Sequence, residues 1–194
     1  MTKGEDTRAT VLDAALAMAS RDGLAGVTLG RLAEQVGMSK SGLFAHFASK
    51  ERLEVGILEA GIARFIAEVV SPALRAKRGE PRLRALFERW LAWGDKGPGG
   101  CVFRVAGVEL DDKPGPARDL LVSSQQDLVD TFATAARIAV EEGHLKKGTD
   151  VQQLAFEIYC LGYGYHQVAR LLRTTDARRR ISVAFDRLLD TARN

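Results

Sequence analysis

The residues of this chain that could do chemistry gather in the segment TLGRLAEQVGMSKSGLFAHFASK, residues 28–50. Gly37 stands four residues after Ala33 and six before Leu43, a spacing that suits two short helices crossing at a tight turn. Ala33 is small enough for a close crossing, and Gly37 can adopt the positive φ that the turn requires. The second helix would then present groups able to approach base edges and phosphates: Lys40, Ser41, Gly42, Ala45 and His46.

Three hydroxyl residues, Thr28, Ser39 and Ser49, stand directly before helices expected in this region. A hydroxyl at this position accepts a hydrogen bond from an N–H group of the first turn, and the remaining N–H groups suit a phosphate. The segment therefore predicts a DNA-binding helix-turn-helix. The same spacing also fits an ordinary helical hairpin that never contacts DNA, so both interpretations remain open.

The elements that must position this segment are helices, because apolar residues recur at spacings of three and four and no convincing alternating run interrupts them. This pattern predicts an all-α fold of about nine helices, the first four forming a compact unit of about 50 residues. Asp22 and Gly23 are expected to end the first helix. The expected helices cover residues 7–21, 29–36, 40–47, 50–75, 82–95, 101–110, 117–142, 150–173 and 176–192.

The 194 residues, 46% of them hydrophobic, can form a core without disulfide or metal support. Two cysteines, no apolar run of about 18 residues and a polar start exclude a disulfide framework, a membrane span and a secretory signal. These features predict a cytoplasmic protein. The net charge of +3 indicates an anionic partner only weakly, since residues 1–55 are neutral, with seven basic and seven acidic side chains.

No constellation typical of an enzyme is present. His46, His144 and His166 are scattered, and the motifs HExxH, CxxC, GxGxxG and GxSxG are absent. Carboxylate pairs such as Glu141-Glu142 lie beside Gly or Pro in turn-like segments. We therefore expect no catalytic residues, no cofactor and no metal site.

The segment resembles the N-terminal signature of the TetR family of bacterial transcriptional regulators. The matching residues, in an ungapped stretch of about 50 residues from Thr7, are Thr28, Leu32-Ala33, Val36-Gly37, Ser39-Lys40, Leu43, Phe44-x-His46-Phe47 and Ser49-Lys50-Glu51-x-Leu53. The resemblance implies a DNA-binding domain of three helices at residues 1–52, the third being the recognition helix. An effector-binding and dimerisation domain would follow at residues 53–194.

The resemblance also implies roles for single residues. Lys40, Ser41, Gly42 and Ala45 would face bases, while Thr28, Phe44, His46 and Lys50 would lie at or near the phosphate backbone. Ser39 is a further candidate from the residues themselves, because the helix end that it caps has N–H groups that suit a phosphate. The family usually has Tyr where this chain has Phe44, so a hydroxyl that could bond a phosphate is missing here. We expect Lys40 and Ser41 to carry most of the direct readout of bases, because Lys can pair with guanine.

Aromatic residues of the C-terminal region are candidates for an effector pocket, which the resemblance places mainly between helices 50–75 and 150–173. Tyr159, Tyr163 and His166 share one helical stripe, and apolar walls with a few polar tips are what a small-molecule cavity needs. The candidates are Phe87, Trp90, Trp93, Phe103, Phe132, Tyr159, Tyr163 and His166. Each of these aromatic side chains could instead belong to the core.

The last helix carries an apolar stripe that must be covered by its own domain or by a partner. The expected interface consists of Ile181, Ala184, Phe185 and Leu188, with Gly162 allowing close approach of the preceding helix. Together with the resemblance, this stripe predicts a homodimer. Cys160 is expected to pack among apolar neighbours, whereas Cys101 is either a buried residue or a redox sensor.

These patterns predict a sequence-specific DNA-binding transcriptional regulator. The resemblance implies a repressor that leaves a palindromic double-stranded operator when an unidentified small-molecule effector binds. Two alternatives remain: a helical ligand-binding or interaction module that does not bind DNA, and a ligand-dependent activator.

Overall fold

The computed structural model describes residues 3–96 and 99–194. Its helices are α1 (Lys3–Gly26), α2 (Leu29–Val36), α3 (Lys40–Phe47), α4 (Lys50–Phe65), α5 (Ser71–Ala73), α6 (Glu80–Asp95), α7 (Val102–Leu110), α8 (Pro116–Glu141), α9 (Val151–His166) and α10 (Ala177–Ala192). The π-helical turn η1 (Ile66–Val70) joins α4 to α5, and η2 (Gln167–Leu171) extends α9, so these described residues form nine continuous helices. They contain no strand, and Leu145 and Arg193 form an isolated antiparallel bridge. The prediction of an all-α fold is confirmed.

The predicted end of the first helix coincides with a kink inside α1. Gly23 has φ 79° and ψ 167°, and the chain then completes one more turn before α1 ends at Gly26. Residues with a Cβ rarely adopt such a positive φ, so glycine suits this position. After the kink, the N–H of Val27 donates to the Leu24 carbonyl at 3.1 Å just before α2 begins.

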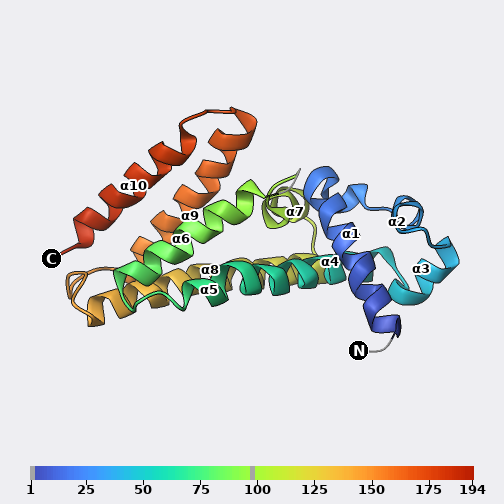
Figure 1. Ribbon diagram of the computed structural model, residues 1–194, viewed down its shortest axis with the longest axis horizontal. Helices are drawn as coiled ribbons and strands as arrows, with labels where there is room; N and C mark the ends of the chain where they lie inside the picture. The colour runs from blue at the N-terminus through green and yellow to red at the C-terminus, as the bar shows by residue number, and fades with distance from the viewer. Residues whose placement is uncertain (1–2, 97–98) are drawn as a thin grey trace. The chain divides into compact units, whose positions relative to one another are not determined.

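Contacts divide the chain into two compact units. The first consists of Met1–Phe65 and Lys96–Ser124, and the second of Ile66–Asp95 and Gln125–Asn194. The first unit thus holds α1–α4, α7 and the start of α8 (Figure 1). It is larger than residues 1–52 because α4 and α7 both pack on α1. A domain boundary at residue 52 stays a prediction.

The core of the first unit joins the predicted helix-turn-helix to α1, α4 and α7. Leu32 and Leu43 are fully buried, and Phe47 is 2% exposed. At Gly61 a Cβ would lie 3.3 Å from the Phe103 ring and 3.4 Å from Leu16. A glycine on α4 therefore lets α1, α4 and α7 meet closely.

The core of the second unit is rich in aromatic rings from α6, α8, α9 and α10. Phe87 and Phe185 stack with their ring centroids 4.1 Å apart and an interplanar angle of 8°. A Cβ at Gly162 would lie 2.1 Å from the Trp90 ring, so α9 approaches α6 where it has no side chain. This packing buries Phe87, Phe132, Phe185 and Trp90 to 3% exposure or less.

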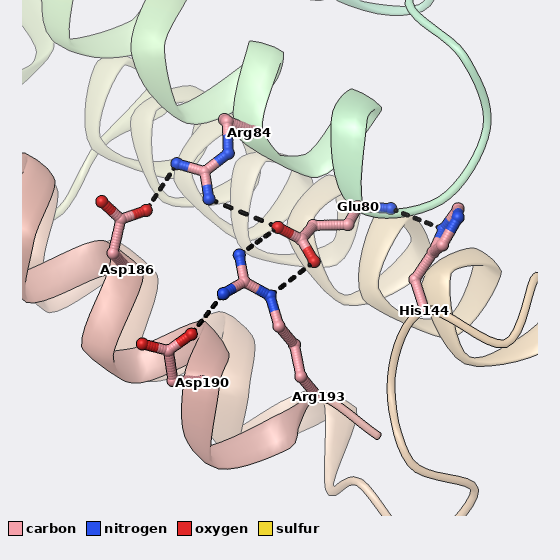
Figure 2. A network of polar contacts seen from close by, with 6 residues as sticks. All are labelled: Glu80, Arg84, His144, Asp186, Asp190 and Arg193. Atoms are coloured by element: carbon pink, nitrogen blue, oxygen red, sulfur yellow. Dashed lines mark hydrogen bonds and ion pairs between the residues drawn. The ribbon is translucent and has the colours of Figure 1, made fainter.

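An ion-pair network ties the start of α6 to the end of α10 (Figure 2). Arg193 donates two hydrogen bonds to the Glu80 carboxylate, one of them 2.9 Å long. Arg84 bridges Glu80 and Asp186, at 3.3 and 2.7 Å. The hydrogen bond from Arg193 is the main cause that lowers the pKa of Glu80. The backbone N–H of Glu80 donates to Nδ1 of His144 at 3.2 Å, which adds the loop after α8 to the same network.

Candidate DNA-binding interface

The turn between α2 and α3 has the geometry that the spacing of small residues predicts. Gly37 has φ 67°, in the left-handed region, and its N–H donates to the Glu34 carbonyl at 3.3 Å. The N–H of Met38 donates to the Ala33 carbonyl at 2.9 Å. A Cβ at Gly37 would meet nothing within 4 Å, so this position favours glycine through its backbone conformation alone.

The three predicted helix caps are confirmed. Hydroxyl oxygens accept backbone N–H groups at Thr28 (from Arg31, 3.3 Å), Ser39 (from Gly42, 3.0 Å) and Ser49 (from Arg52, 3.1 Å). Each hydroxyl satisfies one of the N–H groups that lack a partner within the helix. The other N–H groups of these first turns are suitable donors for phosphate oxygens.

One side of α3 is exposed and carries Lys40, Ser41, Phe44 and Ala45. Gly42 and His46 are half-buried, while Leu43 and Phe47 point into the core. The Ser41 hydroxyl lies 3.2 Å from the Ser39 hydroxyl. Lys40 passes close to Gly30 of α2, because a Cβ added at Gly30 would lie 3.2 Å from Cε of Lys40. The fold thus gathers the residues predicted to face bases, and their contacts with DNA stay a prediction.

Lys50, a predicted phosphate contact, has its ammonium group occupied within the chain. Nζ donates to the carbonyls of Leu24 and Val27 at 2.5 and 2.6 Å, and it pairs with Glu54 at 3.1 Å. These partners match the three donors of an ammonium group. In this structure Lys50 therefore fastens the start of α4 to the junction of α1 and α2.

Glu109 of α7 binds the same junction as a hydrogen-bond acceptor, whereas Lys50 binds it as a donor. Sequence reasoning missed this role of Glu109. Its Oε2 accepts the N–H of Leu24 at 2.6 Å and that of Ala25 at 3.4 Å. A Cβ at Gly23 would lie 2.0 Å from Oε1 of Glu109, so the glycine allows this approach. Glu109 and Leu24 lie 85 residues apart in the sequence, and the only sequence signal for their contact is the glycine at position 23.

Five of the predicted pocket residues form one aromatic cluster in the second unit. Trp90 has its ring centroid 5.6 Å from Phe132, 5.8 Å from Tyr159, 6.3 Å from Tyr163 and 6.5 Å from His166. The hydroxyls of Tyr159 and Tyr163 both donate to Oε1 of Gln125, at 3.3 and 3.1 Å. Gln125 is a further polar residue of this cluster that the sequence did not indicate. Effector binding here stays a prediction.

The other three predicted pocket residues lie elsewhere. Phe87 stacks on Phe185 in the core of the second unit. Phe103 belongs to the first unit, where its ring centroid lies 6.1 Å from that of Phe65. Trp93 is half-buried on α6. The structure thus separates a Trp90-centred cluster from residues that the aromatic pattern grouped with it.

An apolar groove of about 780 Å³ runs between α9 and α10. Three predicted interface residues line it, namely Ile181, Ala184 and Leu188. The other two lie in the core of the unit: Gly162 against the Trp90 ring, and Phe185 against Phe87. Phe156, which is 58% exposed, and Gly164 also line the groove.

The two cysteines differ from expectation in one case. Cys160 is exposed and lines the groove, so the expectation that it packs in the interior is wrong. Cys101 is 5% exposed, which favours the buried-residue interpretation over a redox sensor, since sensor thiols are accessible.

Within the described ranges, no three side chains of His, Cys, Asp or Glu are arranged to hold a metal ion. The helices described there are also too short or too polar to cross a membrane.

Comparison with known proteins gives two matching family profiles. Residues 11–54 match the profile described as bacterial regulatory proteins, tetR family. Residues 79–185, more than half of the chain, match the profile described as tetracyclin repressor-like, C-terminal domain.

Solved structures share the fold of this chain, and curated proteins match part of its sequence. A TetR transcriptional regulator from Chloroflexus aurantiacus is 22% identical, with a TM-score of 0.86 over 98% of this chain and 96% of that chain. AibR, solved in complex with isovaleryl coenzyme A and operator DNA, is 22% identical, with a TM-score of 0.69 over 83% and 86%. The nucleoid occlusion factor SlmA of Vibrio vulnificus is 31% identical over 104 residues, 50% of each chain, so this chain spans about half the length of that relative. The chain belongs to the TetR family of bacterial regulatory proteins.

Proposed function

We propose that this protein is a sequence-specific DNA-binding transcriptional regulator whose reading surface is the exposed side of α3. The observation that carries the proposal is the α2–α3 turn. Gly37 at φ 67° forms this turn, and the hydroxyls of Thr28 and Ser39 cap the starts of α2 and of the recognition helix α3. Lys40 and Ser41 lie exposed on its first turn, where a helix-turn-helix contacts base edges. Helix N-termini beside them supply donors for phosphate, which fix the position of the protein on the duplex.

We infer that the operator is bound by a homodimer. The groove between α9 and α10 is almost entirely apolar in its lining and leaves Phe156 exposed, a surface that water disfavours. Glu157 of α9 and Arg187 of α10 both line the groove, so a twofold arrangement that sets α9 of one copy against α10 of the other would bring opposite charges together. Dimeric helix-turn-helix proteins bind half-sites one DNA turn, about 34–36 Å, or somewhat more apart, so a twofold dimer would suit a palindromic site.

The effector is proposed to be a small molecule with an apolar or aromatic body. Support comes from the Trp90-centred cluster, where two tyrosine hydroxyls and Gln125 offer polar groups among aromatic rings. The relative AibR was solved with both isovaleryl coenzyme A and operator DNA, which shows that a protein of this fold can hold both. A coupling of about 1–3 kcal/mol between effector and operator would release a repressor.

Selection of bound sites from random duplex DNA tests this function. We expect a palindromic consensus whose affinity falls steeply with salt. Lys40→Ala should narrow the ratio of specific to non-specific affinity, whereas Lys147→Ala, at an exposed lysine of the second unit, should leave it unchanged. Failure to recover any preferred sequence would favour an interaction module without DNA binding.

A reporter placed behind the selected site separates repression from activation. For a repressor, deletion of the gene raises reporter expression. Loss of expression on deletion would identify a ligand-dependent activator instead.

A further inference from the structure

Phe44 is a large apolar side chain in an unusual place. It lies on the recognition helix α3 and is 53% exposed. Among described residues up to Phe65, no other large apolar side chain is left on the surface to this degree. Its neighbour Ala45 is exposed on the same side of α3. The exposed side of α3 therefore changes along its length, from Lys40 and Ser41 in the first turn to Phe44 and Ala45 in the second.

The packing of α3 explains why Phe44 stays outside. Leu43 is fully buried and Phe47 is 2% exposed, so these two residues satisfy the contact of α3 with the core. Phe44 follows Lys40 by four residues and lies above it on the same side of the helix. Any molecule that docks on Lys40 and Ser41 along α3 thus meets the phenyl ring next.

The chemistry of the phenyl ring limits what it can recognise in DNA. Phe44 has no donor or acceptor, so it cannot hydrogen-bond a phosphate oxygen or the polar edge of a base. In the major groove, the apolar group that a protein can contact is the C5-methyl group of thymine. Burying that methyl group against Phe44 and Ala45 removes apolar surface of both molecules from water.

We infer that Phe44, with Ala45 beside it, reads the 5-methyl group of one thymine in each operator half-site. This inference rests on the proposed DNA-binding function and specifies the ligand of the second turn of α3. A rise of about 1.5 Å per residue sets Phe44 about 6 Å beyond Lys40, close to two base-pair steps of about 3.4 Å. The thymine is therefore expected about two base pairs from the base that Lys40 contacts.

The test uses the full-length protein and the operator recovered by selection from random DNA. Each thymine of the half-site is replaced in turn by deoxyuridine, which keeps the base pair and removes only the methyl group. We expect one thymine per half-site at which this replacement weakens binding about fourfold, and about fifteenfold when both half-sites are changed. Replacement at the other thymines should have little effect.

Variants at position 44 assign the effect to this side chain. Phe44→Ala should bring the thymine-to-deoxyuridine affinity ratio close to one, whereas Phe44→Leu should keep most of it because an apolar side chain remains. Lys40→Ala should lower affinity but preserve the ratio, and Lys147→Ala should change neither. Since Phe44 is exposed, Phe44→Ala should unfold at nearly the wild-type temperature, which circular dichroism verifies.

Two results overturn the inference, and they are distinguishable. If the selected operator contains no methyl-sensitive thymine, or if Phe44→Ala keeps the full ratio, Phe44 does not read a methyl group although DNA binding stands. If selection recovers no preferred sequence at all, the proposed function fails and this inference fails with it.

Discussion

At the scale of single residues, function depends on which polar side chains already have hydrogen-bond or ion-pair partners within the chain. The Lys50 ammonium binds two carbonyls and one carboxylate of its own chain, whereas Lys40 extends past Gly30 to the surface. Two lysines that look alike in the sequence thus have different tasks. Lys50 holds the backbone that leads into α2, and Lys40 is the residue proposed to contact a base.

Lys50→Ala should therefore act first on stability. Removing the ammonium leaves the carbonyls of Leu24 and Val27 without their partner, and we expect the free energy of unfolding to fall by about 1–3 kcal/mol in urea denaturation. The salt dependence of DNA binding should keep the wild-type slope. A slope flatter by about one unit would show that Lys50 turns to a phosphate in the complex.

Gly37→Ala should weaken the turn through backbone conformation alone. The left-handed φ of 67° disfavours a residue with a Cβ by about 1–2 kcal/mol, although the added atom meets nothing within 4 Å. Thermal unfolding should show a lower midpoint for Gly37→Ala, and a smaller decrease for Gly37→Asn, because Asn tolerates this region. Equal midpoints for Ala and Gly would contradict the conformational argument.

At the scale of elements, the junction of α1 and α2 is held from two helices. Glu109 of α7 accepts its N–H groups, and Lys50 of α4 donates to its carbonyls. The junction positions α2, and α2 with its turn positions α3. A displacement of α7 or α4 therefore reaches the recognition helix through hydrogen bonds as well as through apolar packing.

Glu109→Ala should loosen this junction without touching the DNA-facing side chains. We expect faster hydrogen exchange at the amides of Leu24 and Ala25, and a loss of about 1–3 kcal/mol in the free energy of unfolding. Glu109→Gln keeps an acceptor oxygen and should retain most of the protection. Unchanged exchange in Glu109→Ala would show that packing of α7 alone fixes the junction.

At the scale of the whole molecule, the free energy of unfolding should depend on pH at acidic values through the ion-pair network of Figure 2. The hydrogen bond from Arg193, aided by Arg84, lowers the folded-state pKa of Glu80 below its usual value of about 4.3. Its stabilising contribution is thus complete above that usual value and is lost as the pH falls through the lowered pKa. Glu80→Gln should remove this part of the acid dependence, measured as unfolding free energy between pH 3 and 7. An unaltered profile would rule out Glu80 as a source.

Dimer formation should depend on the charged residues Glu157 and Arg187 that line the groove. Glu157→Lys or Arg187→Glu alone places like charges across the proposed twofold interface, and we expect each variant to dimerise about threefold to tenfold more weakly in sedimentation equilibrium. Mixing the two variants should restore association as a heterodimer. Arg179→Ala is the matched control, since Arg179 pairs with Asp176 and lies outside the groove lining. Normal dimerisation of both reversed variants would exclude this pairing.

Much of this protein was predictable from the sequence, because its helices depend on local features. Apolar spacing of three and four residues, the hydroxyls at Thr28, Ser39 and Ser49, and the glycines at positions 23 and 37 act within a few residues of themselves. These features predicted the nine helices, the α2–α3 turn and its caps. The charge count failed as a guide to DNA binding, because the segment that carries the reading helix is neutral.

Only the tertiary structure decided which of several similar residues lie in the core and which line a surface groove. Helical periodicity shows that an apolar stripe exists but not which neighbour covers it, so Gly162 and Phe185 proved to be core while Cys160 and Phe156 proved to line the groove. The contacts of Glu109 with Leu24 and of Gln125 with Tyr159 join residues far apart in the chain, and no local pattern encodes such pairs. Local sequence thus determined the helices and their ends, whereas the packing of those helices on one another determined which side chains stay exposed at the surface.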